Sequence, residues 1–362
     1  MALQDHVFPI IQLAMTRIQE HTSFVDYADC LRVFAILAVI ALHSSASGIV
    51  QYGQLGEFNW WAANAVDSMC RWAVPVFIML SGALLLTPSR RDKLWNFYLK
   101  RLRRVGIPLV IWAACYFYWT ARYYGEAVDK EFIVDALKSG LTYNHLYFLF
   151  IVLGLYAVTP PLRKIVGGFP VWALWLLALF FMAMPVFGIL YHVVSMNAFT
   201  MFLPYLGYFL IGHLIRSVAF WKHTLAVSLA CYGSSSLAIT LATGMLVGQL
   251  GIEDPQALRY YNHFHWLVVI QSISIFFVLR CLFYAVDAPC WNKILRRLAP
   301  LTFGIYLIHV IFLDIARNYT SFLYENITIL GIFTELVMVY AISAFASYVL
   351  LKTPGVRWVI GS

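Results

Sequence analysis

Charged residues are scarce in this sequence. Only 12% of its 362 residues are Asp, Glu, Lys or Arg, and 62% are hydrophobic, whereas soluble domains carry about 25% charged residues. Long apolar runs recur along the whole sequence and are separated by short loops, so we expect no separate soluble domain. The low charge excludes an ordinary soluble protein and indicates a polytopic membrane protein.

Several chemical signatures are also absent. The six cysteines form no CxxC pair and have no His-rich neighbours, so the sequence predicts neither a zinc site nor a disulfide framework. There is no Walker loop, no GxGxxG and no GxSxG elbow. We therefore expect no bound metal and none of the common nucleotide-binding or serine-hydrolase sites.

Apolar runs of about 17 to 25 residues are long enough to cross a bilayer, and they predict an all-α membrane bundle with about ten transmembrane helices. Residues 1–26 are predicted to form a cytoplasmic or interfacial segment, and residues 27–362 a single transmembrane domain. The predicted spans lie near 31–50, 66–86, 105–124, 145–162, 170–190, 199–215, 224–247, 264–286, 300–316 and 329–351.

The net charge of +8 fits a membrane topology, so no nucleic-acid partner is expected. If the N-terminus is cytoplasmic, most of the 25 Lys and Arg residues fall on the inside, as the positive-inside rule requires. Both termini are therefore predicted to be cytoplasmic. Arg71 falls within the second span, and the basic residues on the outside are Arg122, Lys130, Lys138, Arg259 and Arg317.

Two ionisable residues lie in the first predicted span. A helix with about 1.5 Å of rise per residue separates Arg32 from His43 by roughly 16 Å, half of a hydrocarbon core of about 30 Å. If Arg32 lies at one surface, His43 lies deep in the bilayer, where ionisable groups usually have a function. A neutral imidazole can take a proton from a hydroxyl. We therefore predict that His43 is catalytic.

The second predicted span carries Asp67 and Arg71, four residues apart, for which a structural ion pair is as good an explanation as a functional one. Pro75 is expected to kink this helix, and Ser81 with Gly82 permits either a close helix approach or access to the backbone.

Further polar residues lie in later spans. For His145 and His309, taken singly, an interhelical hydrogen bond is a simpler explanation than catalysis. Near the outer ends of the last two spans, a structural network is predicted for Asp314, Arg317 and Glu335.

A basic run from Arg90 to Arg104 precedes the third predicted span. Its simplest role is to anchor the chain on anionic lipid. The alternative is a phosphate site, because Arg101 and Arg104 are three residues apart and share a face of an α-helix.

These segments together resemble acyltransferase family 3, whose members are integral membrane O-acyltransferases that modify sugars of bacterial surface glycans. Asp29, Arg32 and His43 are similar to its Asp-x-x-Arg and Arg-x10-His motifs, and Arg101 with Arg104 to its Arg-x-x-Arg motif. Val33 departs from the family, which often has Gly there. The other similar segments are Val74–Gly82, His145–Leu149 and Gly304–His309, which contains Tyr306.

The resemblance implies transfer of an acetyl or other short acyl group from cytoplasmic acyl-CoA, by default acetyl-CoA, to a hydroxyl of a cell-surface or lipid-linked glycan at the bacterial inner membrane. It implies catalysis by His43 and Arg32, and donor binding by Arg101, Arg104 and Arg32. The chain lacks an appended esterase-like domain, so separate glycan-assembly proteins are expected partners, beside membrane lipid. The further candidate site residues are Asp29, Arg71, Ser81, His145, Tyr306 and His309.

Two kinds of alternative stay open. His43 can deprotonate the sugar hydroxyl directly, or it can accept the acyl group before passing it on. A glycan or lipid transporter or flippase also has many spans and intramembrane charges, but it typically shows two related halves with interrupted helices, which we do not find in this sequence. A channel is a further alternative, but it needs a recurring ring of pore-lining groups, which one chain does not obviously supply. A lipid-linked glycosyltransferase is another, but it would use paired carboxylates and a metal, and Asp29, Asp67, Asp314 and Glu335 are scattered.

Overall fold

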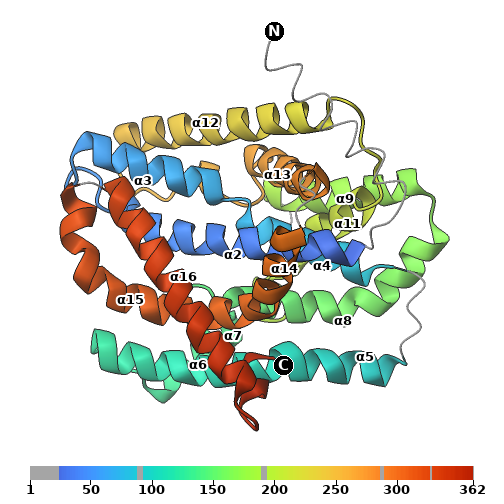
Figure 1. Ribbon diagram of the computed structural model, residues 1–362, viewed down its shortest axis with the longest axis horizontal. Coiled ribbons are helices and arrows are strands. Elements are labelled where there is room, and N and C mark those ends of the chain that lie inside the picture. The colour runs from blue at the N-terminus through green and yellow to red at the C-terminus, as the bar shows by residue number, and fades with distance from the viewer. Residues whose placement is uncertain (1–23, 88–92, 189–193, 286–288, 327, 362) are drawn as a thin grey trace. The chain divides into compact units, whose positions relative to one another are not determined.

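The computed structural model describes residues 24–87, 93–188, 194–285, 289–326 and 328–361. Within these residues all regular structure is helical, as the sequence predicts (Figure 1). Most of the predicted interfacial segment 1–26 lies outside them. The α-helices are α2 (Phe24–Ile49), α3 (Glu57–Cys70), α4 (Ala73–Leu85), α5 (Leu94–Arg101), α6 (Ile107–Trp119), α7 (Lys130–Ser139), α8 (Tyr147–Gly168), α9 (Val171–Val186), α11 (Leu206–Ile215), α12 (Thr224–Leu250), α13 (Trp266–Ala285), α14 (Pro289–Leu298), α15 (Thr302–Asn326) and α16 (Thr328–Lys352).

Seven helical segments of the described chain are long and apolar enough to cross a membrane. They coincide with seven of the predicted spans, and the predicted spans 170–190 and 199–215 correspond to shorter apolar helices at Val171–Val186 and Leu203–Ile215. The count of ten and the sides of the termini remain predictions. The seven segments are Tyr27–Ile49, Glu57–Leu85, Tyr147–Gly168, Thr224–Leu250, Arg259–Tyr284, Asn292–Asn326 and Thr328–Lys352.

The predicted span 105–124 has an interrupted local structure. Its α-helix, α6, has 13 residues, and π-helical segments at Leu102–Gly106 and Thr120–Tyr124 flank it. Pro108 cannot donate a backbone hydrogen bond to residue 104, and its ring crowds that carbonyl. A wider turn before the proline relieves this crowding, which gives a local reason for the first π-helical segment.

The second predicted span is divided where its sequence predicts a kink. Helix α3 ends at Cys70 and α4 begins at Ala73, with a turn at Arg71 and Trp72 between them. Pro75 explains the position of the turn, since it cannot donate to the carbonyl of Arg71. The α-helical pattern resumes with the bond from Val76 N to Trp72 O, at 3.0 Å.

Packing divides the described chain into two units. The first unit comprises residues up to Phe77, Val218–Thr302 and Phe312–Ala344. Within it α2 packs against α3 and α13, and α12 packs against the same two helices, as Figure 1 shows for α2, α3 and α12. Leu237, Leu241 and Met245 lie one helical turn apart on α12, and their apolar side chains are exposed. Such a row is stable against lipid rather than water.

The second unit comprises Ile78–Ser217, Phe303–Ile311 and the residues from Phe345 onward. In this unit α4 approaches α11 at two glycines. A β-carbon at Gly82 would overlap the Phe209 carbonyl, and one at Gly212 would overlap the Met79 carbonyl. The close approach predicted for Gly82 is therefore confirmed, and it lets the two backbones touch as in other membrane helix pairs.

Two arginines bind the carboxyl end of α4 in the second unit. Arg163 of α8 donates from Nε to the Leu85 carbonyl at 2.6 Å. Arg216, which follows α11, donates from Nη1 to the Ala83 carbonyl at 3.1 Å. These cations satisfy carbonyls that have no partner within a helix and complement the negative end of the helix dipole.

Candidate functional site

Asp29 and Arg32, two of the predicted site residues, form an ion pair on α2. The Nη1 atom of Arg32 lies 2.6 Å from Oδ1 of Asp29, which is one helical turn earlier. The side chain of Arg32 remains 33% exposed and that of Asp29 21% exposed. Arg32 therefore has a partner for part of its charge and still presents a guanidinium that a ligand can reach.

His43 is half-buried near the carboxyl-terminal end of the same helix. Its backbone carbonyl accepts a hydrogen bond from Nη2 of Arg317, in α15, at 2.9 Å. Because Arg32 and His43 both lie on α2, the predicted separation of roughly 16 Å follows from the rise of about 1.5 Å per residue. The structure thus confirms that both residues lie on one helix, and the depth of His43 in the bilayer stays a prediction.

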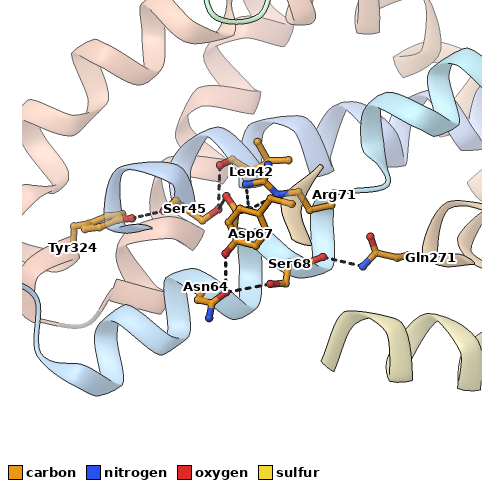
Figure 2. A network of polar contacts seen from close by, with 9 residues as sticks. Leu42, Ser45, Asn64, Asp67, Ser68, Arg71, Gln271 and Tyr324 are labelled. Atoms are coloured by element: carbon orange, nitrogen blue, oxygen red, sulfur yellow. Dashed lines mark hydrogen bonds and ion pairs between the residues drawn. The ribbon is translucent and has the colours of Figure 1, made fainter. Parts of the chain in front are cut away.

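Asp67 and Arg71 form a buried ion pair beside α2 (Figure 2). The Asp67 side chain is fully buried and that of Arg71 is 17% exposed. Arg71 donates from Nε to Oδ1 of Asp67 at 2.5 Å, and its Nη2 contacts the same oxygen. Its guanidinium lies over the ring of Tyr261, 3.8 Å from the centroid, so the cation is also stabilised by the aromatic face.

Amide and hydroxyl groups extend this network to α12 and α13. The Tyr261 hydroxyl donates to Oδ1 of Asn64 at 2.7 Å, and Nδ2 of Asn64 donates to the Thr240 carbonyl at 3.0 Å. From α13, Nε2 of Gln271 donates to the Ser68 carbonyl at 2.8 Å and to Oγ of Ser236 at 2.7 Å. Paired polar groups of this kind tolerate burial in an apolar bundle.

The network also reaches the turn of α2 that follows His43. The Ser45 hydroxyl lies 3.0 Å from the Leu42 carbonyl and 3.4 Å from Oδ2 of Asp67. From α15, the Tyr324 hydroxyl lies 3.0 Å from the Ser44 carbonyl and 3.3 Å from the Ser45 carbonyl. Figure 2 shows Ser45 between Tyr324 and Asp67.

The residues predicted to form a network near the ends of the last two spans have partners on their own or the adjacent helix. Nη1 of Arg317 lies 3.6 Å from Oδ1 of Asp314. The Thr320 hydroxyl donates to Oε1 of Glu335 at 2.8 Å. Asp314 and Glu335 are both buried, so these contacts offset part of the cost of removing the carboxyl groups from water.

The second unit contains a cluster of histidine and tyrosine side chains, formed by His145, Tyr306, His309, Tyr116 and Tyr143. The ring of His145 lies 5.1 Å from that of His309 and 5.3 Å from that of Tyr306, centroid to centroid. Three predicted site residues distant in sequence therefore meet. The Tyr306 hydroxyl donates to the His145 carbonyl.

The protonation of His309 follows from one of its contacts. Its Nδ1 lies 2.7 Å from the Tyr306 carbonyl oxygen, and a carbonyl can only accept a hydrogen bond. Nδ1 therefore carries a proton, and in the neutral ring Nε2 is the basic nitrogen. His309 is completely buried, which suits a structural hydrogen-bonding role as well as a chemical one.

Arg101 and Arg104 have different surroundings in the second unit. Arg101 ends α5 and lies 4.3 Å from the Phe97 ring centroid, whereas Arg104 is exposed and belongs to a π-helical segment. A π-helical turn contains more residues than an α-helical turn. The sequence argument from three-residue spacing requires a continuous α-helix from Arg101 to Arg104, and here Arg104 belongs to the π-helical segment instead. Their joint role in binding phosphate stays a prediction.

The remaining predicted residue, Ser81, lies half-buried on α4 beside the glycine contact with α11. Sequence reasoning missed the polar partners supplied by other helices. Their residue types are common in membrane helices and carry no local spacing pattern that would reveal these contacts. The missed residues are Ser45, Asn64, Tyr261, Gln271 and Tyr324.

The described residues contain no group of three His, Cys, Asp or Glu side chains that could hold a metal ion. The arrangement offers three kinds of functional group, which are arginines paired with carboxylates, imidazoles and phenol hydroxyls. Such groups can bind anions, transfer protons and stabilise negative charge.

The helical fold with its apolar segments defines a multi-pass membrane protein. A family model described as an acyltransferase domain matches residues 25–352. The chain therefore belongs to acyltransferase family 3. Comparison with curated proteins and with solved structures gives no match.

Proposed function

We propose that this membrane acyltransferase moves an acetyl or other short acyl group from cytoplasmic acyl-CoA to a hydroxyl of a cell-surface or lipid-linked glycan at the bacterial inner membrane. The observation that carries the proposal is the family match over residues 25–352, which includes every residue given a role below. The match is to an enzyme that transfers acyl groups, so transport has no comparable support.

Arg101 and Arg104 are proposed to bind the phosphates of the donor. Arg104 is exposed, and the guanidinium of Arg101 lies 4.3 Å from the Phe97 ring centroid. Guanidinium groups form strong, charge-assisted hydrogen bonds with phosphate oxygens.

His43 is proposed to act on the acceptor hydroxyl. In the direct route its imidazole takes the hydroxyl proton while the hydroxyl oxygen attacks the thioester carbonyl carbon. The carbon–sulfur bond then breaks, and the CoA sulfur leaves with that proton. Arg32 lies roughly 16 Å away along α2 at about 1.5 Å per residue, a distance that the extended pantetheine arm of the donor can cover.

In a second route the imidazole nitrogen of His43 attacks the thioester first and carries the acyl group to the hydroxyl. Only this second route forms an acylated enzyme. Mixing labelled acyl-CoA with enzyme in the absence of acceptor, followed by rapid quenching, leaves label on the protein only in the second route.

The experiment that tests the function uses purified enzyme in vesicles supplied with radiolabelled acetyl-CoA and a lipid-linked glycan. Label on the glycan supports the proposal, and chemical analysis of the product identifies the modified hydroxyl. Movement of the glycan across the membrane without transfer of label would instead support a transporter. Vesicles without the enzyme provide the background rate.

A further inference from the structure

The turn of α2 around His43 is held by two side chains that lie more than 270 residues away in sequence. Arg317 donates to the carbonyl of His43 at 2.9 Å. Tyr324 places its hydroxyl 3.0 Å from the carbonyl of Ser44 and 3.3 Å from that of Ser45. Three successive carbonyls, beginning with that of His43, therefore contact side chains of α15.

These contacts are additional to ordinary helix bonding. Within an α-helix each carbonyl accepts from the N–H four residues later, and its second lone pair usually faces a side chain, water or lipid. Arg317 and Tyr324 are seven residues apart, two turns of α15, so both project from one face of that helix. One face of α15 thus contacts the turn of α2 that begins at His43, and Figure 2 shows Tyr324 beside Ser45 in this turn.

Both donors are well suited to hold a backbone in place. The Tyr324 side chain is buried, and its rigid ring leaves the hydroxyl few alternative positions. Arg317 also lies 3.6 Å from the buried carboxylate of Asp314, which keeps its guanidinium near the helix surface. A charged donor makes a stronger hydrogen bond to a carbonyl than a neutral one.

We propose that Arg317 and Tyr324 are positioning residues that set the orientation of His43 for acyl transfer. This inference rests on the proposed catalytic role of His43. Neither residue is assigned a contact with the reacting atoms, because both act on the backbone. Their effect on the rate follows from geometry, since a catalytic group displaced by about 1 Å can lose about 10²-fold in rate.

The test compares Tyr324→Phe and Arg317→Met with two matched controls in purified enzyme. Tyr340→Phe also removes a buried tyrosine hydroxyl, one with no hydrogen-bond partner, and Arg259→Met removes an exposed arginine. We expect each test variant to lower kcat per folded molecule by about tenfold or more, which is a partial loss of positioning. The KM for acyl-CoA should stay within about twofold of wild type if binding energy is unchanged.

Arg317→Met leaves the buried Asp314 carboxylate without that cation, so the variant can lose folded protein. The double variant Asp314→Asn with Arg317→Met removes both charges and should fold while retaining the low kcat. Arg317→Lys keeps a cationic donor and should recover part of the kcat that Arg317→Met loses. A normal kcat per folded molecule in Tyr324→Phe and in the double variant would overturn the proposal.

A second comparison separates this inference from the proposed function. In a His43→Ala background, Tyr324→Phe should cause no further loss of kcat, because its effect operates through His43. A further loss of the same size would overturn the positioning role. If His43→Ala alone keeps wild-type activity, the catalytic assignment of His43 fails, and the positioning proposal that depends on it fails for that separate reason.

Discussion

Asp67 and Arg71 show how this apolar chain tolerates buried charged residues, because each lies beside an opposite charge. The carboxylate of Asp67 is fully buried, and Arg71 covers it from the same turn of chain while stacking on Tyr261. Removing water from two charges costs several kcal/mol per ion, and close pairing offsets much of that cost. Each member of the pair therefore tolerates burial only as long as the other is present.

Replacing one member of this pair should be more damaging than replacing both. Arg71→Met leaves a buried carboxylate without its cation, and the free energy of unfolding should fall by about 3 kcal/mol. The double variant Asp67→Asn with Arg71→Met should recover at least about half of that loss, since no buried charge remains. Thermal unfolding in detergent measures both. A double variant less stable than Arg71→Met would contradict this explanation.

The cations proposed to bind the donor should control its affinity. Replacing Arg101 and Arg104 together with Gln removes two charge-assisted contacts worth roughly 1.5 to 3 kcal/mol each, so the KM for acyl-CoA should rise at least about tenfold. Arg103→Gln is the matched control, because this residue is exposed in the same basic segment. If the folded double variant has an unchanged KM for acyl-CoA, the two arginines do not bind the donor, and lipid anchoring is their remaining role.

At the scale of helices, the crossing of α4 and α11 depends on the absence of side chains at two positions. Gly82→Val should lower the unfolding temperature, because overpacking a close contact typically costs about 1 to 3 kcal/mol and the Phe209 carbonyl is backbone that cannot move aside. Gly233→Val on α12 is the control, since no atom lies near its added β-carbon. Equal stability of the two variants would show that the crossing can open without cost.

Local chemistry made part of the fold predictable from the sequence. Seven spans follow from apolar length, and the break between α3 and α4 follows from Pro75, because the effect of proline acts within four residues. The π-helical segment before α6 has the same kind of cause in Pro108, but its consequence for Arg101 and Arg104 was missed. Three-residue spacing predicts a shared face only within an α-helix, and Arg104 lies in the π-helical segment.

The contacts of the candidate site were less predictable. Asp29 with Arg32 and Asp67 with Arg71 are separated by one turn, so their pairing can be read from spacing. Tyr324 reaches Ser44 from 280 residues away, a contact that depends on how helices pack. The meeting of His145, Tyr306 and His309 has the same origin, and their sequence segments indicated it only through resemblance to a family.

For the whole molecule, the distribution of basic residues predicts that both termini are cytoplasmic. A reporter that is active only outside the cytoplasm should be silent when fused after Ser362. The same reporter inserted after Gly125 should be active, because this residue lies in the predicted outer loop and has open space around it. Activity of the fusion at Ser362 would contradict the even number of spans.

The whole account depends most on His43, because the donor, the acceptor and the positioning residues are all assigned around its chemistry. The direct test is glycan acylation per folded molecule by His43→Ala at saturating acyl-CoA. Cys30→Ala, a buried site on the same helix, and His309→Ala in the second unit are made in parallel. The account predicts that His43→Ala folds, binds acyl-CoA normally and loses at least about 10²-fold in rate. Near-normal turnover by His43→Ala would contradict it, and a selective collapse in His309→Ala would place the chemistry in the histidine and tyrosine cluster.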